Sequence, residues 1–279
     1  MISPRLNMRF NSLLMILLAL FSMLTVQGCG GGGGNDTVTN ADPTGYYNVQ
    51  GTASVGDGSG GTLVINDLQA MVNGDRFIAI SDANGLVYDG KITDITGNDF
   101  SATVSVFQDG VFLSTATLTG MITEGSNITG TLTGNEQGNG TIHNLLYALS
   151  NDTVAAALSS VQNNVNEGWF DRVGGGVQTG FAFAIDVKGN LTPGFSATDG
   201  VFEQCTVGSG TILPVTGTSL YTLDLTLSNC SVSDVNGDYS GLATMRIESE
   251  EAPIGERLVL VVSNTDFSLQ GEFKITLSL

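Results

Sequence analysis

The residues able to do acid–base or nucleophilic chemistry are few and scattered along this chain. His143 is the single histidine in 279 residues, so a histidine-rich metal site and a Ser-His-Asp hydrolase lack the necessary side chains. Glu248, Glu250 and Glu251 form an acidic cluster, and a pair of carboxylates can hydrolyse glycosidic bonds. Such sites also need aromatic platforms for the sugar, and aromatic residues make up only 7% of the chain. We therefore expect no enzymatic activity and no cofactor.

A second acidic group begins like a calcium-binding loop. Asp234, Asn236 and Asp238 match the start of the EF-hand pattern, which then requires Gly at its sixth position and Glu at its twelfth. Tyr239 and Met245 occupy those two positions. The sequence therefore predicts a polar hairpin turn here and no metal site.

The net charge of the chain limits the classes of molecule that it can bind. The sequence has 27 acidic and 9 basic residues, a net charge of −18, although charged residues are only 13% of the total. An acidic protein cannot replace the counterions around a polyphosphate, so nucleic acid is excluded as a partner. Hydrophobic residues make up 41% of the chain, which is enough to build cores and argues against disorder.

The N-terminal segment has the three parts of an export signal. Residues 1–12 carry Arg5 and Arg9 and no acidic residue, and residues 13–26 are almost wholly apolar. A membrane-spanning helix needs about 20 apolar residues, so this run is too short to span. A basic start, a short apolar core and a small residue before the cleavage point are typical of a secretory signal peptide.

The residues from Val26 to Cys29 (VQGC) make the signal more specific. An aliphatic residue, a variable one, a small one and then a cysteine resemble the lipobox of bacterial lipoproteins. The resemblance implies that the signal, residues 1–28, is cut before Cys29 and that the sulfur of Cys29 takes a diacylglyceryl group. Gly30 follows the cysteine in place of an aspartate, which resembles the pattern of lipoproteins sorted to the outer membrane.

Residues 29–44 begin with the lipid-bearing cysteine and five consecutive glycines, a composition typical of a flexible tether. Without residues 1–28 the chain has 27 acidic and 7 basic residues, a net charge of −20, so anionic lipids repel its body. We therefore expect a protein held at the outer membrane by its lipid anchor alone. Whether it faces the periplasm or the outside is left open.

If Cys29 carries lipid, Cys205 and Cys230 are the two remaining cysteines of an exported chain. An even pair in an oxidising compartment is typical of a disulfide. The alternative, a redox-active or metal-binding pair, lacks the Cys-x-x-Cys spacing and a nearby histidine. We predict a disulfide between Cys205 and Cys230.

Beyond Tyr46 the apolar residues recur at every second position. The segments 100–106 (FSATVSV) and 221–228 (YTLDLTLS) are examples, with threonine and serine on the polar face. Turn pairs such as Asn73-Gly74, Asp109-Gly110 and Asn236-Gly237 follow every 8–12 residues. These patterns predict antiparallel hairpins, with about eight strands in 45–148 and about eight in 167–279.

A single helix is predicted between these two groups of strands, because Val154, Leu158, Val161 and Val165 fall on one helical face. The predicted helix covers about 152–165. The predicted organisation is a β-domain at 45–148, a helical linker at 149–166 and a second β-domain at 167–279.

We expect an all-β fold of two tandem up-and-down barrels, because the hairpins follow one another without a long crossover. Two β-sandwiches are the alternative, since they have the same strand period. The overall pattern is similar to lipocalin-like barrels and to the glycine-rich barrels of surface lipoproteins such as transferrin-binding protein B. No specific motif accompanies that similarity, so no binding residue is carried over from it.

Two functions are consistent with this architecture. The first is a non-enzymatic binding module for a small apolar ligand held inside a barrel or for an extracellular protein partner. The alternative is a structural or adhesive spacer without a ligand. The barrel interiors separate the two, because a cavity lined by small and polar residues favours a ligand and packed Leu, Val and Phe favour a spacer.

The substitution Cys29→Ala tests the lipid anchor. We expect it to abolish globomycin-sensitive processing and to release the protein from the membrane fraction, because no acyl chain then holds an acidic body at the bilayer. Labelling with radioactive palmitate and membrane fractionation measure both effects. Unchanged membrane retention of the variant would contradict the lipoprotein assignment.

Overall fold

The computed structural model describes residues 39–149, 155–161, 169–173, 183–192, 201–247 and 256–275. The predicted signal at 1–28, Cys29 and the tether up to residue 38 lie outside the described residues. Residues 39–279 form one compact unit.

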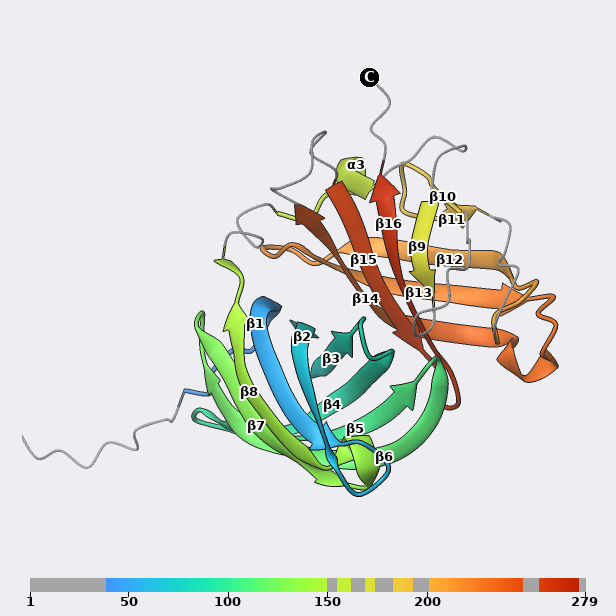
Figure 1. The fold of residues 1–279 in the computed structure, drawn as a ribbon. Coiled ribbons are helices and arrows are strands. Elements are labelled where there is room, and N and C mark those ends of the chain that lie inside the picture. The colour runs from blue at the N-terminus through green and yellow to red at the C-terminus, as the bar shows by residue number, and fades with distance from the viewer. Residues whose placement is uncertain are drawn as a thin grey trace, which may run out of the picture. The chain divides into compact units, whose positions relative to one another are not determined.

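The first eight strands close into an antiparallel barrel in which each strand pairs with the next and β1 pairs with β8 (Figure 1). The strands are β1 Gly45–Gly56, β2 Thr62–Asn73, β3 Arg76–Ser81, β4 Leu86–Thr96, β5 Asp99–Gln108, β6 Val111–Thr123, β7 Asn127–Gly134 and β8 Gly140–Tyr147. Closure leaves no unpaired strand edge in this half. The predicted barrel is therefore confirmed for this part of the chain, and the sandwich alternative is wrong for it.

Strand alternation explains which side chains fill the barrel. In β5, Phe100, Ala102, Val104 and Val106 are buried inside, while Thr103 between them is exposed. The predicted turn residues lie in the turns between strands. Gly74, which follows Asn73, has the positive φ of 59° that a tight hairpin needs. A short 3₁₀ turn, η1 Glu136–Gly138, buries Gln137 at the barrel end between β7 and β8.

The second half forms an open six-stranded antiparallel sheet in the order β12-β13-β14-β15-β16-β9. Its strands are β12 Thr206–Pro214, β13 Leu220–Ser228, β14 Gly237–Ile247, β15 Glu256–Ser263, β16 Ser268–Ile275 and β9 Trp169–Val173, and η2 Ser233–Val235 lies between β13 and β14. A separate pair, β10 Ala184–Ile185 and β11 Leu191–Thr192, is connected to β12 by a single bridge from Asn190 to Thr211. The all-β prediction is confirmed, whereas the residues described here do not close a second barrel.

The sequence predicts a helix at 152–165. Of this range the structure describes residues 155–161, and within them the helix α3 covers Leu158–Val161. Residues 155–157 are not helical, and their hydrogen bonds give the reason. The amide of Ala156 donates to the carbonyl of Thr218, and Ala157 bonds the hydroxyl of Tyr221 through both its amide (3.1 Å) and its carbonyl (3.0 Å). Bonds to the second sheet thus replace a first helical turn, and Val161 is fully buried in the same core.

A third hydrophobic core joins outward-facing residues of the barrel to outward-facing residues of the second sheet. Its members are buried and come from both sheets: Tyr46, Met71, Ile78, Ile80, Val87, Phe107, Ala148, Leu220, Leu242, Val259 and Val261. The strands β3 and β15 are accordingly buried on both faces over most of their length. Burial of this apolar surface stabilises the compact unit by the hydrophobic effect.

The predicted disulfide between Cys205 and Cys230 is confirmed. Cys205 is fully buried, directly before β12, and Cys230 follows β13. Beside the bridge, the amide of Ser231 donates to the carbonyl of Glu203 at 2.8 Å. The bridge therefore fixes the turn before β12 against the loop that leads into β14.

Replacing both cysteines, Cys205→Ala with Cys230→Ala, tests how much this bridge contributes. We expect the free energy of unfolding to fall by about 3 kcal/mol, because the open chain has more conformational entropy when unfolded. Urea unfolding followed by tryptophan fluorescence or circular dichroism measures the change. Dithiothreitol should lower the stability of the native protein by a similar amount and leave the variant unchanged; equal sensitivity of both would contradict the prediction.

Candidate functional site

The sequence predicts a small apolar ligand inside one or both barrels, and β1–β8 form the barrel that the described residues close. The inward side chains of this barrel instead contact one another in a single hydrophobic cluster, whose buried members on the strands are at most 7% exposed, and three further apolar side chains are partly buried against it. Two tyrosines at its ends direct their hydroxyl groups to the backbone: Tyr47 donates to Pro43 at 2.8 Å and Tyr88 to Gln137 at 3.1 Å. Burial raises the pKa of Tyr88, so its phenol stays protonated and remains a donor. This interior has the packed character that favours a solid support.

The sequence-derived candidates for catalysis and metal binding do not come together. His143 is exposed on β8, and the cluster of Glu248, Glu250 and Glu251 lies outside the described residues. Among the residues that the structure does describe, no group of three or more histidine, cysteine or carboxylate side chains could hold a metal ion.

The loop that begins like an EF-hand is a self-capped turn. The side chain of Asn236 accepts a hydrogen bond from the amide of Cys230 at 3.0 Å and donates one to the carbonyl of Ser233 at 2.8 Å. Asp238 lies at the start of β14, where it accepts a hydrogen bond from the hydroxyl of Thr226 at 2.7 Å. These contacts explain the residue types of the loop without an ion.

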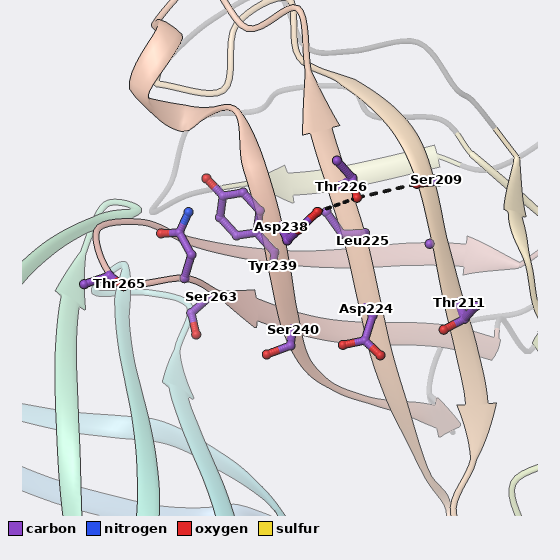
Figure 2. Close-up of a pocket in the computed structure, with 12 residues that line it drawn as sticks. Ser209, Thr211, Asp224, Leu225, Thr226, Asp238, Tyr239, Ser240, Ser263 and Thr265 are labelled. Atoms are coloured by element: carbon purple, nitrogen blue, oxygen red, sulfur yellow. Dashed lines mark hydrogen bonds between the residues drawn. The ribbon is translucent and has the colours of Figure 1, made fainter.

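The structure instead places a polar groove of about 660 Å³ on the outward face of the second sheet (Figure 2). Its floor is formed by β12, β13 and β14, and the end of β15 with the turn after it lines one side. The lining residues are mostly small and polar: Ser209, Gly210, Thr211, Asp224, Leu225, Thr226, Asp238, Tyr239, Ser240, Ser263, Asn264 and Thr265. The groove is therefore rich in hydroxyl groups and contains two carboxylates.

Strand register arranges the polar floor of the groove in two rows across the sheet. One row pairs Ser209 with Thr226 and Thr226 with Asp238, and Figure 2 shows these side chains next to each other. The other row pairs Thr211 with Asp224 and Asp224 with Ser240. Because side chains alternate between the two faces of a strand, all of these groups lie on the same side of the sheet.

The sides of the groove are held in place by ordinary hydrogen bonds. The Asn264 carboxamide oxygen accepts from the amides of Asp266 (2.9 Å) and Phe267 (2.8 Å), which fixes the turn after β15. Tyr239 belongs to the core beneath the floor, and its hydroxyl donates to the carbonyl of Val235 at 2.8 Å. Burial raises the pKa of Tyr239, so this group stays protonated.

At one end of the groove a partly buried charged pair joins the two sheets: the side chain of Arg76 is 30% exposed and that of Asp89 is 12% exposed. Arg76 forms an ion pair with Asp89 at 2.5 Å and donates to the hydroxyl (2.9 Å) and the carbonyl (3.0 Å) of Ser240. The hydroxyl of Ser263 donates to Asp89. The guanidinium of Arg76 is thus already neutralised, and two of the groove's hydroxyl groups are held by this pair.

The groove could not be identified from the sequence alone. The segment 221–228 does show the alternation that sends Asp224 and Thr226 to the polar face. The signal that was missing is the register, because only the pairing of β12, β13 and β14 brings Ser209, Thr211 and Asp238 beside them.

Comparison with known proteins adds no relative. No protein-family model, curated protein or solved structure matches the chain. Within the described residues, no helix is long and apolar enough to cross a membrane.

The substitution Arg76→Met tests the charged pair between the sheets. Asp89, whose side chain is only 12% exposed, would lose its cationic partner, and we expect the free energy of unfolding to fall by about 1–3 kcal/mol. Lys91→Met is the matched control, because Lys91 and Asp75 form an exposed pair at 3.5 Å, and we expect it to change stability by less than about 0.5 kcal/mol. Chemical unfolding of both variants gives the comparison; equal effects would show that burial of the pair does not matter.

Proposed function

We propose that this chain is a lipid-anchored lipoprotein of the bacterial outer membrane that acts as a non-enzymatic binding module for a protein partner. The residues from Val26 to Cys29 and the glycine run after them support the anchor. The proposed location leaves open whether the protein faces the periplasm or the cell exterior.

The observation that carries the binding function is the division between a packed interior and a polar exterior groove. The inward residues of β1–β8 pack against one another in a hydrophobic cluster, which argues against a small apolar ligand inside this barrel. The groove over β12–β14 instead offers surface hydroxyl groups and two exposed carboxylates, Asp224 and Asp238. An outward polar site suits a protein partner better than it suits an apolar small molecule.

A spacer without a ligand is the second candidate, and the packed interior of the first barrel favours it. A solid barrel docked against a second sheet through an apolar core is a suitable rigid support. The spacer does not account for a groove in which nine of the twelve lining residues are Ser, Thr, Asp or Asn, and for this reason we place binding first.

We also propose that the second β-domain, residues 167–279, is a second up-and-down barrel. Each strand from β12 to β16 pairs with the next, as in β1 to β8, and the pairing of β16 with β9 corresponds to that of β8 with β1. The bridge from Asn190 to Thr211 and the hydrogen bond from the Ile212 amide to the Gly189 carbonyl (2.8 Å) bring β11 to the free edge of β12. A pairing of β9 with β10 would complete the ring.

Native mass spectrometry of residues 35–279, produced in a periplasm and purified without detergent, tests the choice between a carrier and a partner-binding module. We expect the mass of the bare polypeptide, because packed side chains occupy the interior of the first barrel. A reproducible additional mass of a few hundred daltons would instead identify a carrier of small molecules.

Cross-linking of intact cells with formaldehyde separates partner binding from the spacer function. We expect a discrete adduct between the full chain and another protein, which is absent when the cells produce an unrelated lipoprotein with the same signal. A spacer would give no discrete adduct.

A further inference from the structure

We infer that the groove over β12–β14 binds an extended basic segment of a protein partner, with two Lys or Arg side chains at alternate positions placed on Asp224 and Asp238. The inference rests on the proposed function, because it names the surface and the chemistry by which a partner is recognised.

The charges of the groove select a cationic ligand. Asp224 and Asp238 are exposed carboxylates, and the twelve lining residues include no Lys, Arg or His. Arg76, which reaches Ser240 at one end, is already paired with Asp89. The chain as a whole has a net charge of −18, so its field attracts cations toward the site and repels anions.

One carboxylate in the groove has no partner among the residues that the structure describes. Asp224 makes no hydrogen bond and no ion pair with any of the described residues, although Thr211 and Ser240 lie directly opposite it on the neighbouring strands. Asp238 accepts one hydrogen bond, from Thr226, and a carboxylate can accept several more. Both groups therefore retain acceptor capacity for the ammonium or guanidinium groups of a ligand.

The spacing of the two carboxylates fits an extended peptide. Asp224 pairs with Ser240, so Asp238 is its diagonal neighbour on β14, and such neighbours lie roughly 7–8 Å apart. In an extended chain, side chains at positions i and i+2 are about 6.6–6.8 Å apart and point the same way. Two basic residues separated by one residue can therefore reach both carboxylates, while the hydroxyl rows bond the peptide backbone.

The lining argues against the other ligands that a groove of this size could accept. Tyr239 is the only aromatic residue among the twelve, and it is 2% exposed with its hydroxyl bonded to Val235, so a sugar ring has no platform to stack on. An apolar ligand would remove water from the carboxylates of Asp224 and Asp238 without giving them a partner, which costs free energy.

Fluorescence anisotropy of labelled hexapeptides, with the full chain purified in a non-ionic detergent, tests the inference. The probes are a peptide with two lysines at alternate positions among serines, and a peptide of the same composition with the lysines adjacent. We expect the first to bind several-fold more tightly, because only its lysines match the diagonal spacing. Addition of salt should weaken this binding, since exposed charges are screened.

The double variant Asp224→Asn with Asp238→Asn should weaken binding of the alternating peptide by on the order of tenfold, as expected for the loss of two exposed ion pairs. The matched control is Asp94→Asn with Asp99→Asn, which removes the same charge from the hairpin between β4 and β5 in the first barrel. We expect less than about a twofold change in the control. Equal weakening of both variants, or equal binding of both peptides, would overturn the inference, as would tighter binding of a glucosamine tetramer.

Photo-cross-linking in cells separates a failure of this inference from a failure of the proposed function. A photoreactive residue is placed at Thr211 in the groove and, in a second strain, at Thr117 on the outer face of β6, where threonine is exposed. Adducts at Thr211 that disappear in the Asp224→Asn, Asp238→Asn background support the groove. Adducts at Thr117 alone would overturn the groove and leave partner binding intact, and no adduct at either position would contradict both.

Discussion

Strand alternation is the constraint on which the rest of this structure depends, because it sends every second residue of a strand to the opposite face of its sheet. The described residues form sixteen strands and the chain has few charged residues, so nearly all of these strands must bury one face. In β1–β8 the sheet meets this requirement by curving until β1 pairs with β8, which encloses the inward residues and removes both edges. The filled barrel is thus a direct consequence of the two-residue period.

The same constraint explains the apolar contact between the two sheets. Alternation of apolar residues with serine and threonine predicts that the outer face of a strand is exposed to solvent. The burial patterns of β5 and β6 agree with this prediction over most of their length. The segments 76–81 (RFIAIS) and 256–263 (ERLVLVVS) are different, because apolar residues there occupy consecutive positions. A strand of that kind is buried on both faces, and β3 and β15 accordingly contribute Ile78, Ile80, Val259 and Val261 to the shared core. The departures from alternation therefore mark the docking surface.

The parts of the fold that local sequence determines could be predicted from it. Alternation and turn residues such as Asn73-Gly74 located the strands, and the number of cysteines left after Cys29 indicated the bridge between Cys205 and Cys230. Features that depend on distant contacts could not be predicted. Residues 155–157 have a helical pattern but bond Thr218 and Tyr221 of the second sheet, and no local signal reveals such partners. The groove likewise requires the register of three strands, which the polar residues of each strand do not specify alone.

A barrel filled with side chains changes where recognition can occur. Its inner face is used to stabilise the fold, and part of its outer face is used to hold the second sheet, so neither is free to contact a ligand. What is left is the remaining exterior, and the groove over β12–β14 has no Lys, Arg or His among its twelve lining residues. On a surface of that kind two carboxylates held by a rigid sheet are strong local features, because few neighbouring charges compete with them.

Asp224 and Asp238 are fixed by the backbone pairing of β13 and β14 and not by ion pairs, so a basic ligand need not displace an existing partner to reach them. Preorganisation of this kind reduces the entropy lost on binding. It allows an acidic protein with few charged residues to recognise a basic segment by position as well as by net charge.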